Sequence, residues 1–216
     1  MVDEAPEVEE VELNPDKLLQ KAGLDKPLHK LYIRAFKHEG ELELWGAGKD
    51  SRRHTLIAVF TVAGQSGVFG PKRKEGDLQV PEGYYKVDRF NPNSRFHLSL
   101  GIDYPNASDR VLSDKEKPGF DIFIHGSNVS IGCLAMTDPV IETIYELASQ
   151  AREREIPVHI YPFRMTAKNL SKFELENPGL KSFWRNLLPG YNHFESAKTP
   201  AKPTVNSRTG RYVWTP

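Results

Sequence analysis

The chain has 216 residues, which is enough for one well-packed domain and short for two. Lys and Arg together number 29, as do Asp and Glu, so the net charge gives no reason to expect nucleic acid or an acidic membrane surface as a partner. The apolar runs are all far shorter than the ~18 residues of a membrane-spanning helix, so we expect no membrane span.

The amino-terminal end is acidic. Residues 1–13 hold six acidic side chains and one proline, and we expect this stretch to be mobile. It also lacks the apolar core of a secretory signal sequence. Asn14-Pro15 then predicts the first turn of a short helix that ends at Gly23.

Apolar runs predict a β-rich central region. The segments 28–36 and 42–45 flank a turn at 38–40, which is the pattern of a β-hairpin. The run 55–62 (TLIAVFTV) is apolar throughout and predicts a central strand. Further strands are predicted at 84–90, 96–100, 120–124 and 156–163.

A long loop separates two of these strands. Residues 64–83 carry five glycines and two prolines, so we expect few regular backbone hydrogen bonds there. The basic run 72–74 fits either a patch for an anionic partner or solvated surface. Because Glu75 interrupts it at once, solvated surface is favoured.

The remaining pattern is helical. Asp138 as the cap and Pro139 in the first turn predict the start of a long helix, with its apolar stripe at Val140, Ile141 and Ile144. Residues 168–195 predict helices whose aromatic and leucine positions form a docking face, and a short edge strand is predicted at 212–214. The fold class is therefore α+β with a mainly antiparallel β core. Its expected parts are an amino-terminal segment at 1–27, a main domain at 28–167 and a carboxy-terminal helical extension at 168–216.

The stretch 120–138, FDIFIHGSNVSIGCLAMTD, holds the residues best suited to chemistry. Cys133 is the only cysteine, and it lies eight residues after His125. The pair is either a nucleophile with its base or a small buried side chain beside a core histidine. Gly126 and Gly132 favour the first reading, because glycine lets the backbone approach a substrate closely. The other histidines show no ligand spacing, so we expect no metal and no cofactor.

These residues resemble the catalytic signature of the YkuD-type L,D-transpeptidase family, and of its YafK-like branch in particular. The segments 71–87, 96–110, 159–165 and 183–195 agree with that resemblance. The sequence departs from the wider family in three ways. The loop between His125-Gly126 and Ser130 is short, Ile131 stands where many members have His or Lys, and Ala135 stands where many have Arg or Asn.

The resemblance implies a YkuD-like core of sandwich or barrel type, with one long helix after the cysteine. It implies that the substrate is a peptidoglycan stem peptide and that Cys133 forms a thioester at the L-centre of meso-diaminopimelate. His125 is then the base, and we expect the Ser130 carbonyl to hold its ring. The N–H groups of Gly132 and Cys133 are expected to form the oxyanion hole.

Residues on both sides of the cysteine are candidates for substrate binding. Tyr104 fits a packing role at least as well, and Arg164 fits a surface cation equally well. The candidate substrate-binding residues are Gly126, Ser127, Tyr104, Ser99, Asp77 and Arg164.

The fate of the thioester separates the possible functions. Attack by an amine gives L,D-transpeptidation, whereas attack by water gives an L,D-carboxypeptidase or an amidase that detaches a wall-linked lipoprotein. A catalytically inactive wall-binding module is the third possibility. The resemblance points to the periplasm, with Met1 in place of a removed signal sequence. The expected partners are stem peptides, with a wall-attached lipoprotein as a possible second one.

Overall fold

A computed structural model describes residues 11–214 of the chain, so most of the acidic stretch that we predicted to be mobile lies outside the described residues. The strands are β1 (Lys30–Phe36), β2 (Glu41–Ala47), β3 (Thr55–Thr61), β4 (Gly83–Ser94), β5 (His97–Ile102), β6 (Ile122–His125), β7 (Leu134–Ala135), β8 (Pro157–Tyr161), β9 (Thr204–Val205) and β10 (Tyr212–Val213). The helices are α1 (Pro15–Lys21), α2 (Ala107–Leu112), α3 (Asp138–Gln150), α4 (Ala167–Glu176), the 3₁₀ turn η1 (Pro178–Leu180) and α5 (Lys181–Ala197).

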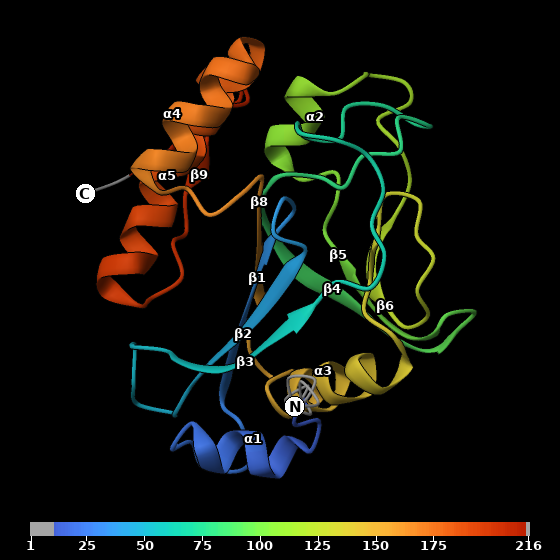
Figure 1. The fold of residues 1–216 in the computed structure, drawn as a ribbon, viewed down its shortest axis with the longest axis vertical. Helices are drawn as coiled ribbons and strands as arrows, with labels where there is room; N and C mark the ends of the chain where they lie inside the picture. Colours follow the sequence, from blue (N-terminus) through green and yellow to red (C-terminus); the bar gives the residue numbers. More distant parts are fainter. Residues whose placement is uncertain (1–10, 215–216) are drawn as a thin grey trace, which may run out of the picture.

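One curled sheet organises the molecule (Figure 1). Its strand order is β3-β2-β1-β8-β4-β5-β6-β7, and β1–β8 and β6–β7 are its parallel pairs. The two ends of the sheet meet just after β3, where Gly64 bridges Ala135 of β7. The Ala135 N–H donates to the Gly64 carbonyl at 2.9 Å, and the Ala63 N–H donates to the Ala135 carbonyl at 2.8 Å. This confirms the prediction of an α+β fold with a mainly antiparallel sheet.

The strand β3 departs from its prediction. We expected a central strand at 55–62, but β3 lies at the end of the strand order. One of its edges pairs with β2 and, within residues 11–214, its other edge pairs with no strand along β3 itself. Leu56 and Val59 are 40% and 41% exposed, whereas Ile57 and Phe60 are buried. An apolar run therefore forms a half-exposed strand here, because the outward-facing positions are apolar as well.

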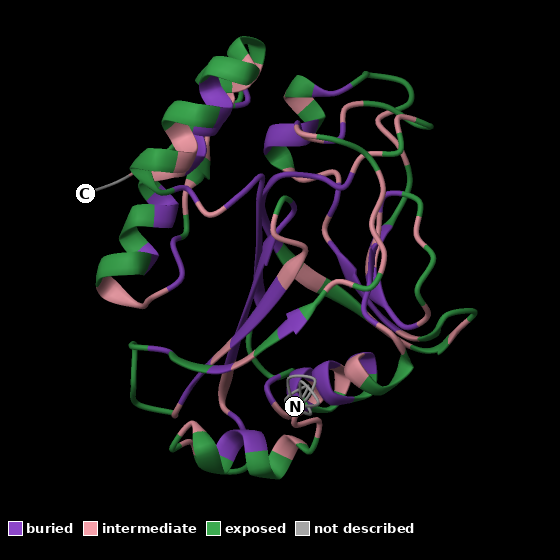
Figure 2. Ribbon diagram, in the orientation of Figure 1, coloured by how far each residue is buried: buried purple, intermediate pink, exposed green. Residues whose placement is uncertain are grey.

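The main core lies between the curled sheet and the helices α1 and α3 (Figure 2). Helix α3 packs against β5 and β6 and buries Ile141, Ile144 and Leu147. Helix α1 begins as predicted, since the Asn14 side chain accepts from the Lys17 N–H at 3.0 Å. Figure 2 shows the exposed residues of both helices on their outer sides.

The carboxy-terminal extension packs through a second, aromatic core. Trp184 of α5 is fully buried in a cluster with Phe36, Tyr84 and Tyr161 of the sheet, and the fully buried Phe194 of α5 packs on Tyr32 of β1. The predicted edge strand at 212–214 is β10, which pairs with β9 in a separate two-stranded sheet. The division into parts at residues 27 and 167 stays a prediction.

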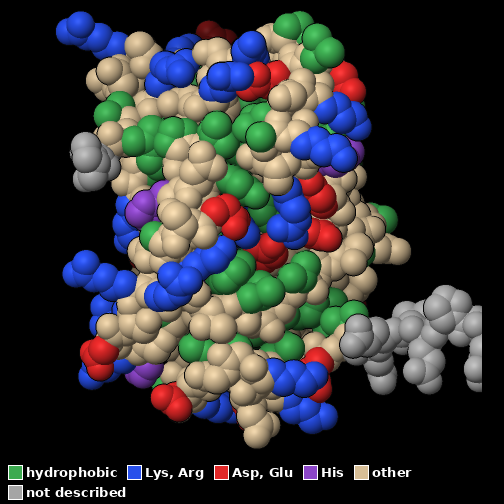
Figure 3. All heavy atoms as spheres, turned by 60° about the vertical axis from the view of Figure 1, so that its left-hand side comes forward, with side chains coloured by type: hydrophobic (Ala, Val, Ile, Leu, Met, Phe, Trp, Pro, Cys, Tyr) green, Lys and Arg blue, Asp and Glu red, His purple; other side chains and the backbone are tan. Residues whose placement is uncertain are grey.

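Charge is spread evenly over the face on which the extension lies. Figure 3 shows acidic and basic side chains next to one another there, with apolar side chains between them. Within residues 11–214, no helix is long and apolar enough to cross a membrane.

Candidate active site

The strand pairing brings the predicted nucleophile and base to one face of the sheet. Ile124 of β6 lies opposite Leu134 of β7, and both belong to the main core. His125 follows the first of these residues and Cys133 precedes the second, so both point to the opposite face by strand alternation. Ser99 of β5 lies directly across from His125 and shares its face. The register therefore places Ser99, a candidate for substrate binding, on the same face as His125 and, by alternation, Cys133.

The His125 imidazole is held in one tautomer. Its Nδ1 lies 2.6 Å from the Gly126 carbonyl oxygen. A carbonyl only accepts, so Nδ1 carries the proton and Nε2 is free to accept one. We expected a backbone carbonyl of this loop to orient the ring, but the residue that supplies it is Gly126 and not Ser130. The ring also packs on Phe96, with centroids 4.7 Å apart.

Burial keeps both reacting groups neutral. It lowers the pKa of His125 below its ordinary value, and the bond to Gly126 opposes this shift. Burial likewise raises the pKa of the half-buried Cys133 thiol, while the Phe123 N–H and the nearby Lys72 ammonium lower it. The resting pair at neutral pH is therefore a thiol and an imidazole, not an ion pair.

The thiol is not bonded to the imidazole in this structure. Its recorded hydrogen bond within residues 11–214 comes from the Phe123 N–H, with nitrogen and sulfur 3.4 Å apart. Catalytic hydrogen bonds are often long before substrate binds. The Cys133 thiol and the His125 imidazole thus lie on one face of the sheet without a hydrogen bond between them.

Serine hydroxyls occupy both N–H groups that we expected to form the oxyanion hole. The Cys133 N–H donates to the Ser130 Oγ at 2.9 Å, and that hydroxyl donates back to the Cys133 carbonyl at 2.7 Å. The Gly132 N–H donates to the Ser66 Oγ at 2.7 Å. Gly132 has φ +85°, which favours glycine at this turn. The two donors are ordered, and each already has an oxygen acceptor.

The loop after His125 is fastened to helix α3. The Ser127 N–H donates to the Asp138 Oδ1 at 2.7 Å. Thr137 is the N-cap residue of α3, so Asp138 is not the cap that we predicted, because its carboxylate serves the loop instead. A side chain on Gly126 would meet the Asp138 carboxylate, which requires glycine there. Substrate contacts by Gly126 and Ser127 stay predictions.

The loop 64–83 lies beside the Cys133 turn and contributes residues that we had not singled out. Ser66 reaches Gly132, and Lys72, which we read as solvated surface, is only 6% exposed. Its ammonium pairs with the Asp77 carboxylate at 2.7 Å. Asp77 also accepts from the N–H groups of Arg73, Lys74 and Gln79. The predicted substrate residue Asp77 therefore shapes this loop.

Two other predicted substrate contacts lie elsewhere. Tyr104 is buried in the main core, where its hydroxyl donates to the Pro118 carbonyl at 2.7 Å. Arg164 pairs with Glu41 and Glu43 of β2, and its guanidinium lies over the Phe36 ring. Packing and ion pairing hold these two side chains in place, and their contacts with substrate stay predictions.

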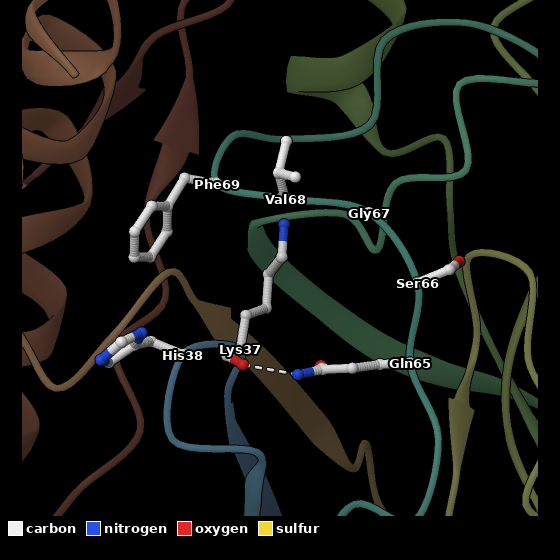
Figure 4. Close-up of a pocket in the computed structure, with 7 residues that line it drawn as sticks. All are labelled: Lys37, His38, Gln65, Ser66, Gly67, Val68 and Phe69. Carbon is white, nitrogen blue, oxygen red and sulfur yellow. Dashed lines mark hydrogen bonds between the residues drawn. The ribbon is translucent and has the colours of Figure 1, made fainter. Parts of the chain in front are cut away.

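Two cavities lie next to the turn formed by residues 130–133, which we call the thiol turn. A cavity of about 140 Å³ is lined by Lys72, Glu75, Gly76, Leu78, Phe120, Asp121, Ile122 and Ile131. A larger one, of about 340 Å³, follows the loop from Gln65 to Phe69 and reaches Lys37 and His38 (Figure 4). Within residues 11–214, no three His, Cys, Asp or Glu side chains gather as a metal site requires.

Ala135 occupies a position with no room for a larger side chain. It is fully buried, and the backbone of Ala63 and Gly64 crosses it where the sheet closes. A Cβ on Gly64 would lie 3.5 Å from the Ala135 Cβ. The closure of the sheet therefore leaves no room for a larger side chain at this position.

Fold and site together define an α+β protein with a thiol and an imidazole at the closing end of a curled sheet. The family model of the L,D-transpeptidase catalytic domain, YkuD, matches residues 32–160. Over 188 residues the chain is 39% identical to Escherichia coli K12 YafK, whose L,D-transpeptidase name is provisional. That match covers 85% of this chain and 73% of YafK, and the protein of the same name in Escherichia coli O157:H7 matches equally. This chain belongs to the YkuD L,D-transpeptidase family.

Solved structures agree on the fold. A single-residue variant of Pgp2, the helical cell shape determining protein of Campylobacter jejuni, has a TM-score of 0.51 at 19% identity. The similarity covers 84% of this chain and 63% of that one. Unsubstituted Pgp2 has a TM-score of 0.50 at 18% identity, covering 90% and 81%. At these identities the likeness concerns the fold alone.

Proposed function

We propose that this protein is a peptidoglycan-modifying cysteine enzyme that acts on stem peptides at the L-centre of meso-diaminopimelate. One observation carries the proposal. Cys133 shares a sheet face with His125, whose proton is held on Nδ1 by the Gly126 carbonyl. The imidazole can therefore accept the thiol proton on Nε2 as the sulfur attacks. Membership of an L,D-transpeptidase family supplies the substrate class.

The proposed acylation balances as follows. The Cys133 thiol gives its proton to the His125 Nε2, and the sulfur bonds to the carbonyl carbon of the L-centre. The resulting tetrahedral intermediate collapses, the C–N bond breaks, and the amine leaves with the proton from His125. A second amine then attacks the thioester carbon, the C–S bond breaks as the new amide forms, and His125 passes the proton of the attacking amine to the Cys133 sulfur.

Oxyanion stabilisation falls to the two N–H groups of the Cys133 turn. Their present acceptors lie at 2.7 and 2.9 Å, which is the range that a tetrahedral oxyanion requires. The Ser66 and Ser130 hydroxyls thus keep the donors aimed in the resting state, and the oxyanion takes their place in the reaction.

The test is incubation with purified sacculi and mass spectrometry of the released and cross-linked muropeptides. The native protein should change the muropeptide profile, and Cys133→Ala should not, although its melting temperature should stay near that of the native protein. Activity that survives in Cys133→Ala would overturn the enzymatic proposal. An unchanged profile with the native protein would instead favour the inactive wall-binding module.

A hydrolytic outcome is the second candidate. Val129 of the short loop and Ile131 of the turn before Cys133 are 59% and 76% exposed, so this side of the turn is open to solvent. An open site admits water, and it also admits a bulky leaving group such as a lysine on a wall-linked lipoprotein. Tetrapeptide sacculi and sacculi with attached lipoprotein remnants separate the outcomes. Tripeptides or released protein fragments would establish the hydrolase, and new cross-links alone would exclude it.

The proposed substrate also sets the proposed location. Peptidoglycan lies outside the cytoplasmic membrane, so the enzyme would work in the periplasm. By analogy with Pgp2, a cell shape determining protein of similar fold, we also propose a role in wall remodelling that affects cell shape.

A further inference from the structure

A buried ion pair holds the loop 64–83 at two points. Glu82 is fully buried, and its Oε1 accepts from the Lys37 ammonium at 3.0 Å and from the Gly70 N–H at 2.9 Å. The same ammonium donates to the carbonyls of Gly70 and Val80, at 2.7 and 3.0 Å. All three protons of this ammonium are thus used, and both halves of the loop are tied to one charged centre.

The carboxy-terminal extension completes that centre. The other oxygen of Glu82 accepts from the indole N–H of Trp184 in α5, with nitrogen and oxygen 3.0 Å apart. The loop residue Phe69 packs on the Trp184 ring and on Phe173 of α4, with centroids 5.6 and 4.9 Å apart. In Figure 4, Phe69 points toward the helices of the extension, and Ser66 points to the opposite side.

The far side of the loop touches the thiol turn. The Ser66 Oγ accepts from the Gly132 N–H at 2.7 Å and donates to the Leu78 carbonyl at 2.8 Å. A Cβ on Gly132 would lie 3.1 Å from the Gln79 carbonyl oxygen. The segments of the loop around Ser66 and Gln79 therefore form one wall of the turn. The loop thus spans the distance between α5 and the residue before Cys133.

We propose that the carboxy-terminal extension is a working part of the active site, with Trp184 as a positioning residue that acts through Glu82, Lys37 and Ser66 on the Gly132 N–H. The proposal rests on the proposed function, because it assigns Trp184 to the oxyanion donors of that reaction. Without the indole N–H, a fully buried carboxylate oxygen loses its donor and the loop loses an anchor. Small misplacements of such donors cost large factors in rate.

Two thiol reactions separate positioning from general loosening. Acylation of Cys133 by a carbapenem, a strained amide, uses the oxyanion donors, whereas alkylation by iodoacetamide does not. Trp184→Phe keeps the ring and removes the N–H. We expect it to slow acylation about tenfold or more and to leave alkylation within about twofold, both followed by intact-mass spectrometry.

The chain offers a matched control. Trp214 also donates its indole N–H within the extension, to the Asn186 carbonyl at 3.2 Å, with no bond to Glu82. Trp214→Phe should leave both rates near the native values. If Trp184→Phe proves poorly folded by its melting temperature, Glu82→Gln undergoes the same assays with the same expected outcomes.

A double-mutant cycle tests the route through Ser66. Ser66→Ala should slow acylation, and Ser66→Ala with Trp184→Phe should be no slower than Ser66→Ala by more than about twofold. Multiplying effects would overturn the route, and equal losses of acylation and alkylation would overturn positioning.

Hydrogen exchange provides a readout that needs no reaction. Trp184→Phe should speed exchange in peptides from 64–80 and 127–133, and Trp214→Phe should not. If the native protein leaves the muropeptide profile of purified sacculi unchanged, the proposed function fails. Faster exchange in those peptides would still support the link between extension and turn, and unchanged exchange would overturn it.

Discussion

Two histidines in this molecule are equally buried and differ in almost everything else. His125 and His159 are each 2% exposed. His159 lies in the middle of the sheet on β8, where its Nδ1 is 2.8 Å from the Tyr32 hydroxyl and its ring packs edge-on against Tyr32 and Tyr84. His125 ends β6, bonds a backbone carbonyl and lies against the 43% exposed Phe96.

The difference between the two histidines therefore lies in the hydrogen-bond partner and not in the burial. A tyrosine hydroxyl can donate or accept, so Tyr32 fixes no tautomer on His159, and aromatic rings enclose that side chain. The Gly126 carbonyl can only accept, so it assigns the proton of His125 to Nδ1. Of the two histidines, His125 is the one on β6, the strand that pairs with β7 beside the thiol at the closing end of the sheet.

The largest effect should come from exchanging the two imidazoles for amides. His125→Gln should slow carbapenem acylation by about 10²- to 10⁴-fold, because no base remains to take the thiol proton. His159→Gln should acylate within a few-fold of the native rate while melting at a lower temperature. Intact-mass time courses and thermal unfolding measure both variants.

The reverse pattern would break the comparison. If His159→Gln slowed acylation as much as His125→Gln at temperatures where both are folded, burial and not tautomer control would be the shared requirement.

The sequence predicted what neighbouring residues determine. Alternation gave the strands around His125, and Asn14-Pro15 gave the start of α1. The edge position of β3 could not be predicted, because the sequence TLIAVFTV is the same whether one or both faces of the strand are covered. The sequence predicted the length and the docking face of the extension, but it did not predict the hydrogen bond from Trp184 to Glu82.

The site was predictable as far as the motif extends. His125 and Cys133 lie within one short stretch, so their common face follows from local strand pairing. Ser66 and Lys72 are brought there by the closure of the sheet at Gly64 and Ala135, which no local pattern records. The ion pairs of Arg164 were not predictable from local sequence either, since its carboxylate partners lie more than 100 residues earlier in the chain.

Acidification should lower the free energy of unfolding through protonation of His159 in the unfolded chain. Burial, with the nearby Arg34 charge, lowers the pKa of His159 to about 3 from an ordinary 6.5. A lowered folded-state pKa means that the unfolded chain binds the proton first, so stability is complete above pH 6.5 and falls as the pH drops toward 3. The loss is on the order of 1.4 kcal/mol per pH unit at most.

Urea unfolding at pH 7, 5 and 4 measures that slope. His159→Gln should start from a lower stability and lose less of it on acidification. The slope that remains belongs to carboxylates and to His125 and His54, because burial also lowers the pKa values of these two histidines. Equal slopes in the native protein and His159→Gln would show that the His159 ring does not take up a proton on unfolding.

The smallest effect concerns the thiol itself. Burial raises the pKa of Cys133, and the Lys72 ammonium opposes that shift without touching the sulfur through any recorded bond. Lys72→Gln should therefore raise the thiol pKa further, which makes iodoacetamide alkylation a few-fold slower below pH 8, since each pKa unit changes the thiolate fraction about tenfold there. The limiting rate at high pH should not change, because the fully formed thiolate no longer depends on the neighbouring charge.

Lys74→Gln, an exposed neighbour in the same loop, should follow the native profile throughout. A lower limiting rate in Lys72→Gln would mean that Lys72 shapes the loop wall and does not act as a charge, because its pairing with Asp77 is also lost.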